Sequence, residues 1–229
     1  MPGLHLYCDL EGGLGRKGDL ALRAAGSLLN EPWFKLKTLV SSRGTFLAAT
    51  YHRAYPVVTF ENDEFFICLE GRIYGMSERA VDKTLSRIAS LLYPGGSPCL
   101  KGNLRSVAGS IESLDGEFLL VVRHKSSGHV TVLNDSLGRL PTYKFEDRSR
   151  LIVSRDIRFL LSMLGRVEID RDALASYLLL GFVPGKGSLV KGIERVQPCS
   201  IVRAGDTESM RTFDIGIRKN RGKDIDICA

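Results

Sequence analysis

The stretch 65–75, FFICLEGRIYG, holds the residues whose types and spacing could carry chemistry. It opens as an apolar run of aromatic and β-branched residues, which predicts a strand buried on both faces. It ends in Glu70, Gly71 and Arg72. The two opposite charges are two residues apart and therefore lie on the same face of the strand. A glycine there permits a sharp turn or a close approach of the backbone. From spacing alone, an ordinary solvated strand end is favoured over a binding site.

The histidines and cysteines offer no further reactive pattern. The five cysteines are odd in number and widely spaced, without a Cys-x-x-Cys pair, which argues against a zinc cage or a redox motif. The four histidines lack the spacing of metal ligands and are interpreted as strand residues: His5, His52, His124 and His129. We therefore expect no metal and no other cofactor, and Cys8 and Cys68 are interpreted as small buried hydrophobes.

The glycines at 13, 15 and 18 formally match a dinucleotide-binding fingerprint, since they follow an apolar strand and precede a helix. No parallel strand ending in an acidic residue follows at the expected distance, and the next segments are typical of antiparallel hairpins. The sequence therefore predicts a flexible loop, followed by a helix that Asp19 caps and that runs to about residue 29.

The order of the elements that must position these residues favours an α+β fold with antiparallel sheets, because strands come in runs and helices in pairs. Hairpins are predicted at 36–52, 57–73 and 200–213, and four further strands between 117 and 154. The clearest amphipathic helix covers 77–93, and shorter helices are predicted at 104–113, 157–164 and 170–180.

Length and composition are those of one globular domain: 229 residues, of which 44% are hydrophobic and 25% charged. The net charge of +6 is spread along the chain, apart from a short basic cluster near the C-terminus at residues 218–223, so we do not expect nucleic-acid binding. No run reaches the ~18 apolar residues of a membrane helix, and the start lacks a secretory leader. We expect a cytoplasmic protein that binds no membrane.

Five ordered segments carry a resemblance to a known family. They are LDGEF at 114–118, NDSLGRLPTY at 134–143, VSRDI at 153–157, GFVPG at 181–185 and KGIERVQP at 191–198. Together with Glu70-Gly71-Arg72-Ile73-Tyr74 they resemble the N-terminal class II glutamine amidotransferase domain of the asparagine synthetase family. The resemblance implies a four-layer α/β/β/α sandwich of the N-terminal-nucleophile hydrolase type. It places a domain at 1–214 and a basic tail or linker at 215–229.

The family's catalytic positions are altered in this sequence. The family's nucleophile is a cysteine at position 2, whose thiolate attacks the amide of glutamine, and position 2 here is Pro2. The family's oxyanion-binding Asn and Gly fall on Glu70 and Gly71, and an ionised glutamate would repel an oxyanion. Arg72 and Asp82 are the remaining candidates for holding the substrate. The resemblance therefore implies a domain whose glutaminase activity is lost, with vestigial positions at Pro2, Glu70 and Gly71.

Asp135 and Gly138 retain the family's Asp-x-x-Gly pattern and are interpreted as structural, bracing the turn that follows a core strand. Family domains of this kind precede an ATP-dependent amide-forming domain. The leading hypothesis is thus a structural or docking module for such a synthetase domain, in cis or in trans. Two alternatives stay open: a working amidohydrolase with a rearranged site, and a module in which Glu70 and Arg72 bind an amino acid.

Overall fold

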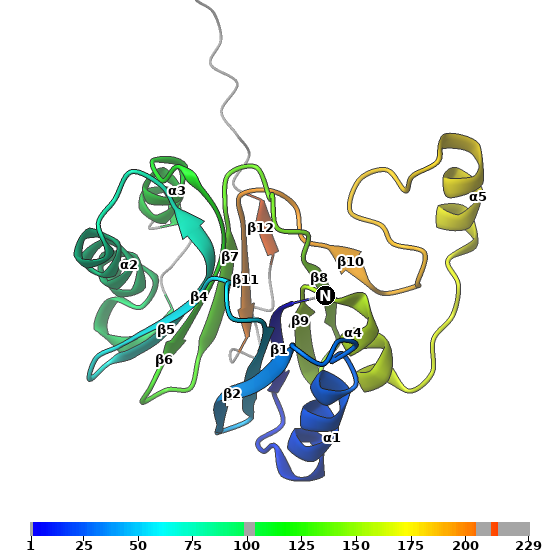
Figure 1. Cartoon of the computed structure of the whole chain (residues 1–229), viewed down its shortest axis with the longest axis horizontal. Coiled ribbons are helices and arrows are strands. Elements are labelled where there is room, and N and C mark those ends of the chain that lie inside the picture. The colour runs from blue at the N-terminus through cyan, green and yellow to red at the C-terminus, as the bar shows by residue number, and fades with distance from the viewer. Residues whose placement is uncertain (1, 99–103, 205–211, 215–229) are drawn as a thin grey trace, which may run out of the picture.

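Two antiparallel sheets form the centre of the protein, whose computed structural model describes residues 2–98, 104–204 and 212–214 (Figure 1). The first sheet has the strand order β10-β8-β9-β1-β3-β2 and the second has the order β12-β11-β7-β6-β5-β4. The first contains β1 (Gly3–Asp9), β2 (Lys35–Ser42), β3 (Thr45–Tyr51), β8 (Tyr143–Glu146), β9 (Arg150–Ser154) and β10 (Glu194–Arg195). The second contains β4 (Val57–Glu61), β5 (Phe65–Ile73), β6 (Gly116–His124), β7 (Val130–Asn134), β11 (Ser200–Ala204) and β12 (Thr212–Asp214).

Helices cover the outer face of each sheet, so the layers run α/β/β/α and confirm the predicted architecture (Figure 1). The helices α2 (Glu78–Leu92) and α3 (Leu104–Glu112) pack on the second sheet through one apolar cluster. The helices α1 (Gly15–Gly26) and α4 (Ile157–Leu164) pack on the first sheet through another. A third cluster fills the space between the sheets. The fifth helix, α5 (Arg171–Leu180), stands apart from both sheets.

Strand β5 shows how the sequence pattern becomes packing. It is buried from Phe65 to Gly71, as the apolar run predicts. Because side chains alternate along a strand, Phe65, Ile67 and Leu69 face α2 and α3, whereas Phe66 and Cys68 join the core between the sheets. The same alternation turns Glu70 toward the first sheet.

Two details of the secondary structure differ from the prediction. Helix α1 begins at Gly15 rather than at Asp19, because the carbonyl of Leu14 accepts the N–H groups of Lys17 and Gly18. The short strand β10, which pairs with β8, was not predicted, because two residues carry too little pattern to be recognised.

The rejection of a dinucleotide fold is confirmed, since β1 is antiparallel to both of its neighbours. The predicted basic tail at 215–229 lies outside the described residues.

None of the helices that the structure describes has the length and apolar character needed to cross a lipid bilayer.

Candidate functional site

Glu70 is the centre of the candidate site, and it is completely buried. Its carboxylate lies between the sheets, where the start of β1 meets the end of β9. One oxygen accepts the backbone N–H of Leu4 at 2.9 Å. The other accepts the Nε–H of Arg155 at 2.8 Å and the hydroxyl of Tyr55. Both carboxylate oxygens of Glu70 therefore already accept hydrogen bonds from groups of this chain.

Arg155 forms a buried ion pair with Glu70 and is itself only 5% exposed. It follows β9 directly, and its guanidinium also donates to the carbonyl of Pro141. Burial raises the pKa of Glu70, and the charge of Arg155 together with the bonds from Tyr55 and Leu4 opposes that rise. Burial and the neighbouring carboxylate raise the pKa of Tyr55, so its phenol remains a donor. The pair is therefore a closed, mutually satisfied network.

Arg72, the opposite charge two residues further along β5, is not the partner of Glu70 in the structure. The side chain of Arg72 is exposed, and Arg155, from the other sheet, is the cation that reaches Glu70. Residues two apart on a strand do share a face, but β5 leaves the covered part of the sandwich at Arg72. The remaining candidate, Asp82, is exposed on α2, where the hydroxyl of Ser86 donates to it at 3.5 Å. Since α2 covers the outer face of the sheet, the structure does not bring Asp82 together with Glu70.

The start of the chain packs directly on this ion pair. A Cβ atom on Gly3 would lie 2.4 Å from the Cβ of Arg155 and 3.3 Å from a carboxylate oxygen of Glu70. The half-buried Pro2 precedes it. Its ring carries no thiol or hydroxyl that could attack a carbonyl and later leave it. The structure thus places the start of the chain, through Gly3, directly beside Glu70 and Arg155.

The backbone N–H of Gly71, the second vestigial oxyanion donor, is also occupied. It donates to the carbonyl of Pro56 at 2.9 Å, next to the pairing of β4 with β5. A donor that stabilises a tetrahedral intermediate must point at the position where the oxyanion forms. Gly71 points at a protein carbonyl instead.

Asp135 holds the turn that follows β7. It is 1% exposed, and its carboxylate accepts the N–H groups of Phe118, Leu137 and Arg139 at 3.0–3.3 Å. Its own carbonyl accepts the N–H of Gly138 at 3.1 Å and that of Cys199 at 3.0 Å. These bonds join two strands and a turn, with the carboxylate acting as an acceptor for backbone N–H groups.

Replacing Gly138 with valine is expected to lower the free energy of unfolding by about 1–3 kcal/mol. The residue has a φ of 59°, and a Cβ would lie 3.1 Å from the Cα of Pro198, so a branched side chain meets both strain and crowding. The matched control is Gly13→Val, where nothing lies within 4 Å of the added Cβ. Urea denaturation measures both; equal stability losses would contradict a structural role for Gly138.

Sequence reasoning missed Arg155 and Tyr55, the two side chains that satisfy Glu70. Arg155 stands within the VSRDI segment that carried the resemblance, and an arginine at the end of a buried strand was the available signal. Tyr55 stands between β3 and β4, in a segment without periodicity. Nothing local in the sequence links either residue to Glu70, which lies 85 residues from Arg155 and 15 from Tyr55.

The cysteines among the described residues are free thiols in buried positions: Cys8, Cys68 and Cys199. Burial raises the pKa of Cys8 to about 12 and that of Cys199 to about 11. At neutral pH both are therefore protonated, and a thiol is a far weaker nucleophile than a thiolate. Cys99 and Cys228 lie outside the described residues. Within the described ranges, no three His, Cys, Asp or Glu side chains gather where they could hold a metal ion.

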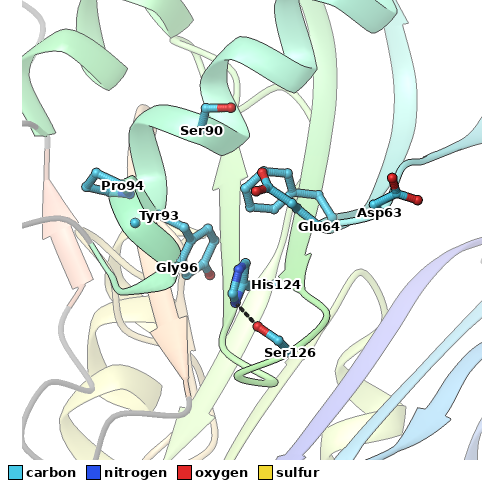
Figure 2. A pocket seen from close by; sticks show the side chains of 10 residues that line it. Asp63, Glu64, Ser90, Tyr93, Pro94, Gly96, His124 and Ser126 are labelled. Atoms are coloured by element: carbon cyan, nitrogen blue, oxygen red, sulfur yellow. Dashed lines mark hydrogen bonds between the residues drawn. The ribbon is translucent and has the colours of Figure 1, made fainter.

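A separate hollow of about 450 Å³ lies at the opposite end of β5, between the end of α2 and the start of the β6–β7 turn (Figure 2). His124 and Tyr93 stack in it with ring centroids 5.6 Å apart. The Nδ1 atom of His124 is bonded to the hydroxyl of Ser127 at 2.7 Å. None of the residues predicted from the sequence to bind substrate lines this hollow.

Comparison with known proteins finds the sequence signature of one domain family in part of the chain. The model of the glutamine amidotransferase domain matches residues 104–213, just under half of the chain. The sequence therefore carries the signature of that domain over this range. No curated protein sequence matches the chain.

Two solved structures are similar to the fold as a whole. One is described as the allosteric regulatory enzyme of purine biosynthesis, with 11% identity, a TM-score of 0.52 and coverage of 93% of this chain. The other is the glutamine phosphoribosylpyrophosphate amidotransferase from B. subtilis complexed with ADP and GMP, with 9% identity, a TM-score of 0.49 and coverage of 92%. The chain spans about half, 48%, of each of these proteins. At 11% identity, the first likeness concerns the fold alone.

Proposed function

We propose that the chain is a class II glutamine amidotransferase-like domain, related to asparagine synthetases, that has lost glutaminase activity and serves as a docking module for an amide-forming domain. The observation that supports the loss of activity most directly is the Glu70–Arg155 ion pair beneath Gly3. Glu70 stands at the position that the resemblance assigns to an oxyanion donor, and the pair packs against the start of the chain at Gly3. The proline at position 2 removes the nucleophile as well.

The docking role rests on the surface of α5. We define this α5 surface as the run Tyr177, Leu178, Leu179 and Leu180 together with Phe182. Leu178 is 75% and Leu179 83% exposed, and the other members are between 46% and 58% exposed. Consecutive residues turn by about 100° on a helix, so three leucines in a row cover more than half of its circumference. A helix end that is apolar over more than half of its circumference is normally covered, which supports a partner for α5.

The partner chemistry follows from the family. Domains of the family that the sequence resembles are joined to an ATP-dependent amide-forming domain. We therefore propose that α5 docks on such a domain, in cis or in trans. The nitrogen for the amide would then come from ammonia or another amine, not from glutamine hydrolysed here. A cytoplasmic location fits that role and fits the three buried free thiols.

The glutaminase part of the proposal is tested by ammonia release from glutamine. We expect no turnover by the native protein, and none by Pro2→Cys alone, because a thiolate attack would build negative charge beside Glu70. Loss of a single oxyanion donor already costs about 3 kcal/mol of transition-state stabilisation. The double variant Pro2→Cys, Glu70→Asn supplies an amide that can donate a hydrogen bond to the oxyanion. It also leaves Arg155 without its carboxylate partner. Robust ammonia release by Pro2→Cys alone would contradict this part of the proposal.

The docking part is tested by hydrogen exchange on the protein, alone and mixed with a purified ATP-dependent amide-forming domain of the asparagine synthetase type. We expect slowed exchange in α5 when that domain is present, and loss of this protection in Leu178→Glu combined with Leu179→Glu. The matched control is Val58→Glu, an exposed apolar position on β4. Unchanged exchange in α5, or equal loss of binding in the control, would refute docking through the α5 surface.

Neither alternative gains an observation of its own. A rearranged amidohydrolase that used Cys8 or Cys199 as its nucleophile would need a thiolate, and both thiols are held protonated by burial. A site in which Glu70 and Arg72 bind an amino acid would need both side chains to face one cavity. Glu70 is completely buried and saturated, whereas Arg72 is exposed.

A further inference from the structure

The end of the sandwich opposite Glu70 holds a hollow of about 470 Å³ with an unusual charge balance. It opens between the hairpin of β2 and β3 and the ends of β5 and β6. Its ionisable lining residues are Arg43, Arg123, Lys125 and Glu61. Lys125 pairs with Glu61 at 2.7 Å. Three cations and one carboxylate leave two positive charges around the hollow.

Arg123 is the buried cation of this hollow. It is 7% exposed and faces the space between the sheets, level with Phe66, its partner across β5 and β6. One terminal nitrogen donates to the hydroxyl of Ser42 at 3.2 Å, and its buried Nε–H has no hydrogen-bond partner. A buried guanidinium with an unmatched donor is costly unless an acceptor arrives from outside the chain.

Arg43 lies across the mouth of the hollow. Its guanidinium donates to the backbone carbonyls of Lys125, at 3.1 Å, and Ser126, which fixes it against the turn after β6. Its positive charge lowers the pKa of Arg123, after the larger effect of burial, so the two guanidinium groups are close enough to repel each other. Neither arginine forms an ion pair with a carboxylate among residues 2–98, 104–204 and 212–214. The excess positive charge and the unsatisfied Nε–H of the buried Arg123 favour the binding of an external anion in this hollow.

We propose that this hollow binds the phosphate group of a small molecule between Arg43 and Arg123, with Lys125 at the rim. A phosphate dianion neutralises the two excess charges, whereas a monocarboxylate leaves one of them unbalanced. Guanidinium groups match the geometry of phosphate oxygens with paired N–H donors. The hollow is also lined by Leu39, Val40 and Phe66, so the molecule has an apolar part next to its phosphate. The site is independent of the proposed docking function.

The test is the thermal unfolding of the full chain titrated with inorganic phosphate, phenyl phosphate and phenylacetate at constant ionic strength in chloride. We expect a saturable rise in Tm with both phosphates, at lower concentration for phenyl phosphate, and a much smaller response to phenylacetate. The two phosphate arms distinguish recognition of the bare anion from recognition of an ester with an apolar body. Equal responses to phenyl phosphate and phenylacetate would overturn the assignment to phosphate.

Three variants locate the binding. Arg43→Asn keeps a residue that tolerates the φ of 46° at this turn, and Arg123→Met keeps the volume of the buried side chain. We expect each to raise the half-saturating phosphate concentration about tenfold or more. Arg87→Met, an exposed position on α2, removes the same charge and should leave the titration unchanged. Equal shifts in all three variants would show non-specific screening and reject the site.

The same variants test the unpaired charge without any ligand. In phosphate-free buffer, Arg123→Met is expected to unfold at a Tm equal to or above that of the native protein, because a buried charge without a counter-ion is removed. A Tm well below the native value would mean that Arg123 is already compensated inside the fold, and the argument for an external anion would fail.

Discussion

Replacing Arg155 with methionine is expected to lower the free energy of unfolding by about 3–5 kcal/mol. The substitution keeps the apolar volume but leaves the carboxylate of Glu70 completely buried, with only the Tyr55 hydroxyl and the Leu4 N–H to solvate it. Desolvating an unpaired carboxylate is the largest single penalty that one substitution can impose in this interior. Urea denaturation at neutral pH measures the loss.

Two further variants separate the buried charge from lost packing. Glu70→Gln combined with Arg155→Met removes the stranded charge while keeping an acceptor for Tyr55, so much of the stability should return. Lys191→Met breaks an exposed pair with Glu168, 3.6 Å apart, and should cost about 0–1 kcal/mol. If Arg155→Met were no more harmful than Lys191→Met, the pair would not be the buried network described above.

Acidification is expected to destabilise the protein through His5, a buried residue of β1. Its two ring nitrogens lie 2.7 Å from the hydroxyl of Ser154 and 2.9 Å from that of Thr50, and its ring packs on Phe159. Burial lowers the pKa of His5 from 6.5 to about 3. The neutral imidazole therefore fits the folded state, and the imidazolium does not.

The sign follows from proton binding. Between pH 6.5 and about 3, His5 is protonated in the unfolded chain but stays neutral in the folded protein. The free energy of unfolding therefore falls as the pH is lowered. His5 contributes its full stabilisation above pH 6.5 and loses it progressively toward pH 3. One pKa unit corresponds to about 1.4 kcal/mol, so the loss is on the order of 4 kcal/mol at the acid end.

The measurement compares urea unfolding of the native protein and His5→Gln across this pH range. Carboxylates that do not act on His5, such as Asp147, whose pKa is lowered by Ser149 and Arg150 against the effect of burial, contribute to both curves and cancel in the difference. The difference should shrink as the pH falls, because only the native protein carries the titrating imidazole. Parallel curves for the two proteins would show that His5 does not report on folding in this way.

The sequence by itself determined the elements with strong periodicity or clear turn chemistry. Helix α2 begins after Ser77, whose hydroxyl accepts the N–H of Ala80, and helix α5 begins after Asp170 and ends at Gly181 in the left-handed conformation. The apolar run of β5 and the hairpins of β2–β3 and β4–β5 were likewise predicted, since alternation and turn residues act within a few positions. The order of the elements indicated an α+β fold with antiparallel sheets, whereas the four-layer arrangement was implied only by the family resemblance.

Only the tertiary structure decided what each charged side chain meets. Alternation along β5 places Glu70 on the inner face, but whether Arg72 or Arg155 reaches it depends on the position of a strand in the other sheet. The unpaired Arg123 and the turn residue Arg43, 80 positions apart in the chain, likewise meet only because two sheets pack face to face. Electrostatic partners in a sandwich come from long-range contacts, and no spacing within one segment encodes them.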